Sequence, residues 1–214
     1  MEKTITALEP QNRNPDRINV FLDGEFTFGV SRFVGAWLSV GQKLDETKTK
    51  SLISADEKER ALQLALRYIG YRQRTETEVI KKLEKLDFPK EIVKSVMAEL
   101  REKKYVDDNE FATQWVELRS ESKPRSKRFI QFELTKKGIS GDIVDAALEN
   151  SPDDLDMAIR LGQKYIYRYS AINEDEFRKK LTGVLSRRAF SYSVVKDTLD
   201  ELLRIRKEKK KFEE

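Results

Sequence analysis

Neither cysteine nor histidine occurs among the 214 residues of this sequence, and each absence excludes whole classes of site. Without cysteine there is no disulfide, no thiol nucleophile and no zinc–thiolate centre. Without histidine there is no Ser-His-Asp triad, no imidazole proton shuttle and no imidazole-bound metal. The phosphate-binding motifs G-x-x-x-x-G-K-S/T and G-x-G-x-x-G are missing too. The sequence therefore predicts a protein without a cofactor.

Long apolar runs are equally scarce. The longest early stretch without a charge, residues 33–42, is too short to cross a bilayer, and the first residues lack the apolar run of a signal peptide. We therefore expect a cytoplasmic protein that has no contact with membranes. Charged residues make up 37% of the chain, with 42 Lys and Arg against 38 Asp and Glu. The net charge of +4 makes a polyanionic partner plausible without requiring one.

The first thirty residues have the composition of β-strands. Residues 18–22 and 25–30 are rich in β-branched and aromatic side chains, and Asp23-Gly24 between them supplies the positive φ angles of a tight hairpin turn. Residues 4–8 could add a third strand. The pattern predicts a small antiparallel sheet at the N-terminus.

Two connecting segments complete the N-terminal region. Residues 12–16 are predicted to form a loop between the first two strands. A short helix or turn with Phe33, Val34 and Trp37 is expected to cover the apolar face of the sheet. A sheet this small is marginal alone, so it should dock on another element.

From about residue 54 the apolar residues recur at helical spacing, and the helix starts carry capping residues. Thr75 with Glu78 forms a capping-box pattern, Asn173 with Glu176 forms another, and Ser151 before Pro152 is a third candidate N-cap. The predicted helices are 55–70, 75–86, 89–103, 108–122, 126–137, 141–149, 152–169, 174–186 and 192–210.

An internal repeat of 51 residues organises these helices. Five apolar positions of the first copy stay apolar when 51 or 102 is added to their numbers. Upstream, Leu64, Trp115 and Ile166 keep the same spacing, and residues 87, 138 and 189 fall where a helix should end. The fifteen repeated positions are Val79, Leu83, Phe88, Ile92 and Met97, then Ile130, Leu134, Ile139, Ile143 and Leu148, then Leu181, Leu185, Phe190, Val194 and Leu199.

The repeat predicts the fold class and the domains. The chain is expected to be mainly all-α, with three tandem three-helix repeats forming an elongated array after the small β element. The predicted domains are 1–50, a β-rich extension; 51–106, the first repeat; 107–150, the second; and 151–214, the third, ending in a basic helix. A monomer is expected.

Cations cluster in equivalent parts of the repeats. No acid lies between residues 177 and 196, which contain six Lys or Arg, and residues 119–137 hold seven cations against two acids. Such clusters favour a basic face that contacts phosphates or acidic protein, although ordinary solvated helix faces are the alternative. The predicted partner-binding residues are Arg72, Arg74, Lys81, Lys82, Arg125, Lys127, Arg128, Lys136, Lys137, Arg178, Lys179, Arg187 and Arg188.

Other side chains have competing interpretations. Asp107-Asp108 could hold Mg²⁺ in a nuclease, but capping of the helix that follows is favoured. Trp115 falls on a repeated apolar position, which favours the core over a base-stacking platform. Tyr165, Tyr167 and Tyr169 alternate within a predicted helix, so at least one of them should be exposed.

Three stretches of sequence resemble the RecX family of regulatory proteins of the RecA recombinase. The first is residues 72–79 with Lys82-Leu83 and Phe88, the second is Tyr105 to Val116, and the third is residues 130–139 with Ile143 and Ala147-Leu148. The resemblance covers roughly residues 61–202. Asp87, Thr75 and Ser126-Lys127 stand where the family often has Gly, Ser and Gly-Pro, respectively.

The resemblance implies a non-enzymatic protein that binds the RecA filament and restrains strand exchange, ATP hydrolysis and co-protease action. No catalytic or metal-binding residue is carried over from the family. Single- or double-stranded DNA is a further candidate partner. Two alternatives stay open: a helical-repeat module that acts directly on nucleic acid and, more remotely, a carboxylate-dependent metal nuclease.

Overall fold

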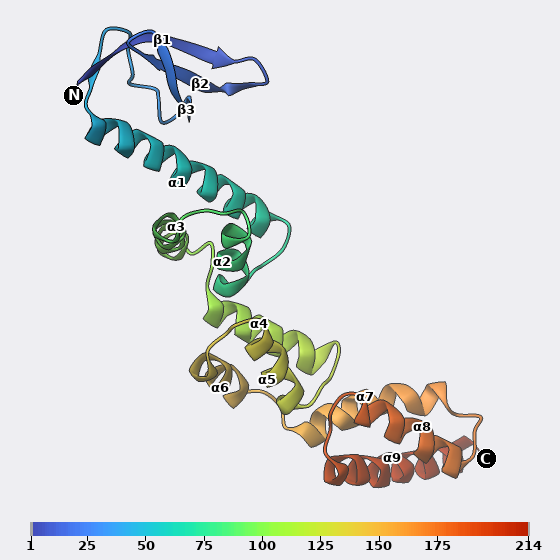
Figure 1. Ribbon diagram of the computed structural model, residues 1–214. Coiled ribbons are helices and arrows are strands. Elements are labelled where there is room, and N and C mark those ends of the chain that lie inside the picture. The colour runs from blue at the N-terminus through green and yellow to red at the C-terminus, as the bar shows by residue number, and fades with distance from the viewer. Residues whose placement is uncertain (1, 214) are drawn as a thin grey trace. The chain divides into compact units, whose positions relative to one another are not determined.

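The computed structural model describes the backbone of residues 2–213 and the side chains of residues 2–208 (Figure 1). The basic helix end at Lys209, Lys210 and Lys211 therefore lies outside the described side chains. The chain divides into two compact units, Met1–Arg74 with Glu78–Val106 and Thr75–Thr77 with Asp107–Glu214. The strands are β1 (Lys3–Gln11), β2 (Asn14–Leu22), β3 (Glu25–Ser31) and β4 (Lys43–Leu44), and the helices are α1 (Glu46–Gly70), α2 (Glu76–Glu84), α3 (Lys90–Glu102), α4 (Asp108–Glu121), α5 (Lys127–Lys136), α6 (Gly141–Glu149), α7 (Asp154–Arg168), α8 (Glu174–Ser186) and α9 (Tyr192–Glu213).

The N-terminal strands form an antiparallel sheet in the order β3-β2-β1-β4. The predicted hairpin is confirmed, since Asp23 and Gly24 have φ values of 52° and 87°. The predicted loop over residues 12–16 is too long, because β2 already begins at Asn14. Backbone pairing of Gln11 with Asn14 extends the first hairpin almost to its turn.

The turn after β3 covers the sheet in a different way than the sequence predicts. Val34 is buried with the sheet core, but Phe33 and Trp37 are 74% and 78% exposed. The turn backbone itself packs on the sheet, since a Cβ added at Gly35 would lie 2.5 Å from Ile18 Cδ1. That close approach leaves the two large rings outside the core.

Helix α1 begins at Glu46 rather than at residue 55. The Asp45 carboxylate accepts a hydrogen bond of 2.7 Å from the backbone N–H of Lys48 and so caps an earlier first turn. The added turns carry Leu52 onto the core of the sheet. Buried Asp56 also joins α1 to the sheet, because it accepts hydrogen bonds from the Arg17 guanidinium at 2.8 Å and from the Ser31 N–H at 2.7 Å.

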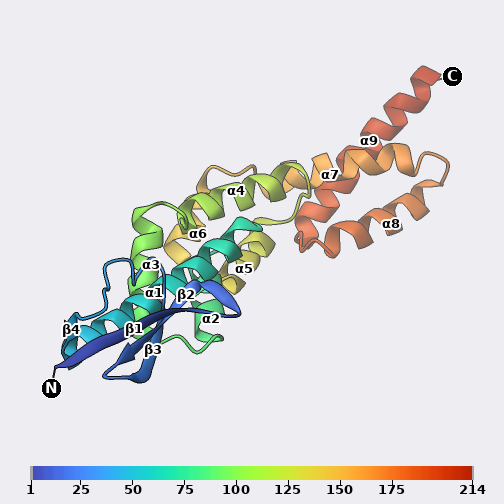
Figure 2. The same cartoon turned by 90° about the horizontal axis from the view of Figure 1, so that it is seen from above.

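The three-helix repeats are confirmed, and each has its own apolar core. Of the fifteen repeated positions, all are buried except Phe88, Ile143 and Val194, which are half-buried. In the third helix of each repeat, the neighbouring row of Val93, Val144 and Val195 is buried throughout. Within the second unit, Figures 1 and 2 show α7, α8 and α9 as one such group of three helices.

The middle helices of the repeats end in the same way. Asp87, Gly138 and Ala189 all have positive φ angles, 60°, 85° and 61°. In each case the following residue donates its N–H to the carbonyl five positions earlier, as in Phe190 to Leu185 at 3.4 Å. This is the hydrogen-bond pattern of a Schellman C-cap, and it confirms the predicted helix ends.

The predicted caps are partly confirmed. Asn173 caps α8, because its side chain accepts the N–H of Glu176 at 2.9 Å. Ser151 is not the N-cap of α7; that residue is Asp153, which accepts the N–H of Asp156 at 2.8 Å. The Ser151 hydroxyl instead donates to the Leu148 carbonyl at the end of α6.

Candidate partner-binding surface

The structure divides the thirteen predicted cations into two groups, and the larger group already has contacts inside the protein. Arg72 forms an ion pair with Glu78 at 3.0 Å. Arg178 lies 3.3 Å from Glu174 and 3.6 Å from Asp200. Such exposed pairs contribute little to stability, but their cations are less available to a partner.

Other predicted cations lie on aromatic rings or bind carbonyl groups. The guanidinium of Arg74 lies 3.9 Å from the ring centre of Tyr68, and that of Arg125 lies 4.3 Å from Phe129. Lys82 approaches Tyr68, and Lys137 approaches Trp115. Lys127 donates to the Leu148 carbonyl, and Arg188 donates to that of Pro124. These cations therefore have structural contacts, which a count of charges along the sequence does not reveal.

Five predicted cations are exposed and have none of these contacts, namely Lys81, Arg128, Lys136, Lys179 and Arg187. Their side chains form no ion pair with any described residue. Arg128 and Lys136 are eight residues apart on α5, and Lys179 and Arg187 occupy the equivalent positions, 51 residues later, on α8 and its C-cap. Eight residues are close to two helical turns, so each pair lies on one helix face.

The start of α5 and the end of α8 meet within the second unit. The N–H of Ser126 donates to the Arg188 carbonyl at 3.2 Å, and the Arg188 guanidinium donates to the Pro124 carbonyl at 3.0 Å. Arg187, the C-cap residue of α8, therefore lies near the first turn of α5, which carries Arg128. We name this set, Lys179, Arg187, Arg128 and Lys136, the basic row.

An exposed aromatic ring interrupts the basic row. Phe132 is 60% exposed and lies one turn from both Arg128 and Lys136, whereas α8 has Gly183 at the equivalent place. The row on α5 can therefore offer apolar as well as ionic contact, which suits a protein surface or a stacked base.

The adjacent acids Asp107 and Asp108 both accept hydrogen bonds from backbone N–H groups. Asp107 caps α4 by accepting the N–H groups of Asn109 and Glu110, which confirms its predicted role. Asp108 does not cap its own helix; its carboxylate accepts the N–H of Glu76 at 2.9 Å. In the next repeat Asp154 accepts the N–H of Lys127 at 2.7 Å. The same kind of contact thus occurs twice in the second unit. The donors Glu76 and Lys127 are 51 residues apart, but the acceptors Asp108 and Asp154 are 46 apart, so the repeat does not indicate the acids.

The remaining predictions on single residues can also be placed. Trp115 is half-buried, packed on Phe111, and donates its indole N–H to Glu133 at 3.1 Å. Tyr167 is 73% exposed, as the alternation of tyrosines predicts. Among the described residues, no cluster of three or more acidic side chains could bind a metal ion, and no helix is apolar and long enough to span a membrane.

Family models match the chain over most of its length. Residues 3–45 match the "Regulatory protein RecX N-terminal domain". Residues 61–100, 107–148 and 152–199 match, in turn, the first, second and third three-helix domains of RecX.

Individual relatives agree with these matches. Regulatory protein RecX of Limosilactobacillus reuteri is 31% identical over 93% of this chain and 76% of its own length, and that of Bacillus pumilus is 30% identical over 98% and 81%. A crystal structure of a regulatory protein RecX is 30% identical and superposes with a TM-score of 0.67, covering 92% of this chain and 99% of that one. By sequence and by fold, this chain belongs to the RecX family of regulatory proteins.

Proposed function

We propose that this protein is a non-enzymatic modulator of the RecA recombinase that binds the RecA–DNA filament and restrains strand exchange, ATP hydrolysis and co-protease activity. RecA is the partner that the family resemblance implies. The observation that carries the proposal is the basic row, in which equivalent cations of two successive middle helices are exposed and have no acidic partner among the described residues.

The basic row suits a long anionic partner better than a small ligand. Its four cations are spread over two helices, and the end of α8 lies against the start of α5. A nucleoprotein filament presents acidic side chains and DNA phosphates along its length. Arginine and lysine can pair with both groups, and arginine does so in a bidentate geometry.

Charge reversal tests the proposal directly. The variant Arg128→Glu with Lys136→Glu, and separately Lys179→Glu with Arg187→Glu, should each weaken co-sedimentation with RecA filaments at least about tenfold, because attraction becomes repulsion at two points. The inhibition of RecA-dependent ATP hydrolysis should weaken in parallel.

The matched control reverses two cations elsewhere in the same unit. Arg160 and Lys164 are exposed on α7, one turn apart, so Arg160→Glu with Lys164→Glu changes the net charge by the same amount. Circular dichroism should show unchanged helix content in all three variants. Equal loss of filament binding in the control would show that net charge, and not the basic row, determines binding.

Direct DNA binding is the second candidate function, and Phe132 between two cations favours it. The two functions differ in their dependence on salt. Binding to duplex DNA through the row should weaken with a log–log slope of about −0.9 for each phosphate contacted. Strong binding to free DNA with this slope, unchanged by RecA, would favour the second function.

A further inference from the structure

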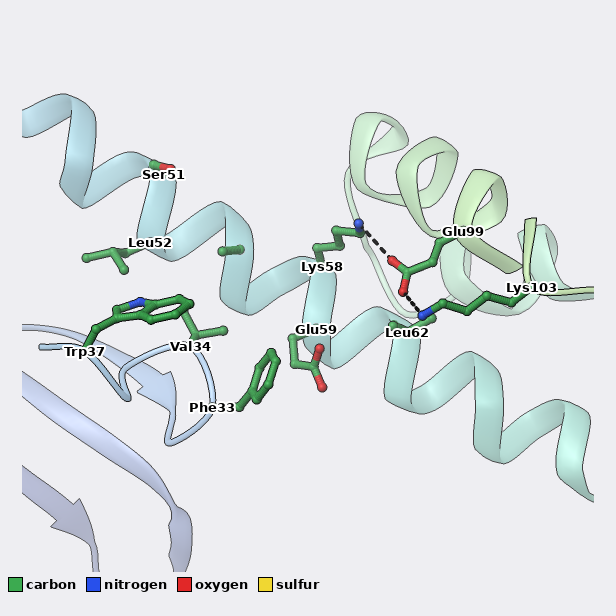
Figure 3. A pocket seen from close by; sticks show the side chains of 11 residues that line it. Phe33, Val34, Trp37, Ser51, Leu52, Lys58, Glu59, Leu62, Glu99 and Lys103 are labelled. Carbon is green, nitrogen blue, oxygen red and sulfur yellow. Dashed lines mark hydrogen bonds and ion pairs between the residues drawn. The ribbon is translucent and has the colours of Figure 1, made fainter. Parts of the chain in front are cut away.

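Two hollows lie side by side in the first unit, and both are lined by Phe33 and Glu59. The first, of about 560 Å³, lies between the turn after β3 and helices α1 and α3 (Figure 3). The second, of about 620 Å³, lies between the strands β2 and β3 and the later part of α1. Each volume is in the range of ordinary ligand sites.

The first hollow presents aromatic rings on a fixed backbone. Phe33 and Trp37 are 74% and 78% exposed, and Figure 3 shows them on the same turn, facing α1. Buried Val34 and the hydrogen bond from Gly35 N–H to the Ser31 carbonyl, 2.9 Å, hold that turn against the sheet. Exposed rings on an ordered turn form a stacking surface, because the described part of the chain leaves most of their area uncovered.

Two acids, Glu99 and Glu59, balance the two lysines that line this first hollow. Lys58 and Lys103 both bind Glu99, at 2.9 Å and 2.7 Å, as the dashed lines in Figure 3 mark. The hydrogen bonds from Lys103 and Lys58 lower the pKa of the Glu99 carboxyl below its ordinary 4.5. The carboxylate therefore stays charged at neutral pH and the ion cluster stays closed, so this hollow offers rings rather than positive charge.

The second hollow carries the positive charge instead. Arg32, Arg60 and Arg67 line it, are exposed, and form no ion pair with a described residue, although Arg60 lies 6.0 Å from the ring centre of Phe88. The fourth arginine, Arg17, is held by Asp56. Two acids, Asp16 and Glu59, also line the hollow, and Glu59 accepts a hydrogen bond from Gln63 at 2.8 Å. Three arginines against these two acids leave an excess of guanidinium groups.

We propose that these hollows form a binding site for single-stranded nucleic acid, with bases stacked on Phe33 and Trp37 and phosphates bound by Arg32, Arg60 and Arg67. Adjacent places for rings and for anions match the alternation of base and phosphate along a single strand. A duplex fits less well, because its bases are already stacked on one another. An acidic peptide matches the arginines but leaves the exposed faces of the two rings without a planar partner.

This site is separate from the basic row and does not depend on the proposed filament binding. The variant Arg128→Glu with Lys136→Glu lies in the other unit and should keep the site intact. Failure of filament binding and failure of this site are therefore distinguishable in one protein.

Tryptophan fluorescence of the full chain tests the proposal. The sequence has two tryptophans, Trp37 and Trp115, so Trp115→Phe leaves Trp37 as the sole reporter. Titration with a ten-residue oligothymidylate should quench Trp37 in a saturable manner. Phe33→Ala should weaken binding about fivefold or more, since stacking of one base on an aromatic ring contributes at least that much.

Salt dependence tests the arginines. Arg60→Ala with Arg67→Ala should weaken binding and flatten the log–log salt slope by about 1.4, that is about 0.7 for each single-strand phosphate that is no longer bound. Because Trp115→Phe alters the second unit, the same affinities should also be measured by anisotropy of a labelled oligothymidylate on the chain with both tryptophans.

Two matched controls keep the test specific. Phe26 is 58% exposed on β3 and Arg13 is exposed in the turn between β1 and β2, and neither lines the hollows. Phe26→Ala and Arg13→Ala should leave oligothymidylate binding unchanged. Absence of quenching, or equal losses for Phe33→Ala and Phe26→Ala, would overturn the proposal. Full displacement of the oligonucleotide by an oligoglutamate peptide would assign the surface to an acidic protein segment instead.

Discussion

The second and third repeats have different kinds of side chain at equivalent positions between their helices. At three positions related by 51 residues, the second repeat has Trp115, Arg119 and Glu133, and the third has Ile166, Ser170 and Val184. In the second repeat Arg119 binds Glu133 at 2.7 Å and 3.1 Å. The side chains of this pair are only 13% and 18% exposed.

The third repeat fills the equivalent space with apolar atoms. Ile166 and Val184 are buried in one continuous cluster formed by α7, α8 and α9, and Ser170 is exposed. One backbone pattern therefore tolerates either a mostly buried ion pair or an apolar contact. The difference shows that the ion pair is not required by the repeat, although each of its members depends on the other once both are present.

The largest expected effect concerns what the two repeats share. Leu134 and Leu185 are fully buried at equivalent positions. Leu134→Ala and Leu185→Ala should each lower the free energy of unfolding by about 2–5 kcal/mol, because each leaves a cavity in a closed apolar core. Urea unfolding followed by Trp115 fluorescence in a Trp37→Phe background would report on the second unit.

A surface position on the same helix provides the control. Phe132→Ala on α5 removes a larger side chain from a 60% exposed position. The free energy of unfolding should fall by only about 0.5 kcal/mol in this variant. A loss from Leu134→Ala no greater than that of Phe132→Ala would mean that the 51-residue rows are not the core.

Repetition is the reason that so much of this core could be predicted from sequence. A position that is apolar in all three copies, such as Leu83, Leu134 and Leu185, is a stronger sign of burial than one apolar residue alone. The helix ends with positive φ angles at 87, 138 and 189 have the same spacing. The candidate surface was predicted less well, because a cation such as Arg188 gives no sign in the sequence that a carbonyl 64 residues away will bind it. Exposure of Phe33 and Trp37 was missed because the close approach at Gly35 is a tertiary contact.

The second prediction concerns the ion pair of the second repeat and the apolar contact that replaces it in the third. Glu133→Val alone leaves the Arg119 guanidinium mostly buried without its carboxylate, so the free energy of unfolding should fall by about 1–3 kcal/mol. Arg119→Ser with Glu133→Val installs the residues of the third repeat and removes both charges. The double variant should be more stable than the sum of the two single losses predicts.

The same urea unfolding experiment measures this coupling. Arg125 complicates a simple pair, because its Nε lies 3.9 Å from Glu133 and, among the described residues, makes no hydrogen bond. Strictly additive losses in the Arg119 and Glu133 variants would show that Arg125 or solvent replaces the missing partner, and the contrast between the repeats would lose its energetic meaning.

The smallest expected effect concerns the ion pairs that the third repeat keeps on its surface. Glu174 in the first turn of α8 lies 3.3 Å from Arg178 and 3.4 Å from Lys207. Partial desolvation raises the pKa of Glu174, but Arg178 and Lys207 together lower it by more than desolvation raises it. The pKa of Glu174 therefore lies below the ordinary 4.5. Because the pKa is depressed in the folded state, the ionised form stabilises folding. That contribution is complete above pH 4.5 and disappears as the pH falls through the folded pKa.

A carboxyl-carbon NMR titration of the protein and of Arg178→Gln measures this effect. The pKa of Glu174 should lie below 4.5 in the original chain and rise in the variant, and Lys207→Gln should raise it as well. Stability at neutral pH should hardly change, because exposed pairs contribute little to the free energy of unfolding. Unchanged titration in both variants would mean that Glu174 is screened by solvent. The pairs of Glu174 with Arg178 and Lys207 would then contribute nothing to the stability of the third repeat. The contrast with the mostly buried ion pair of the second repeat would be larger still.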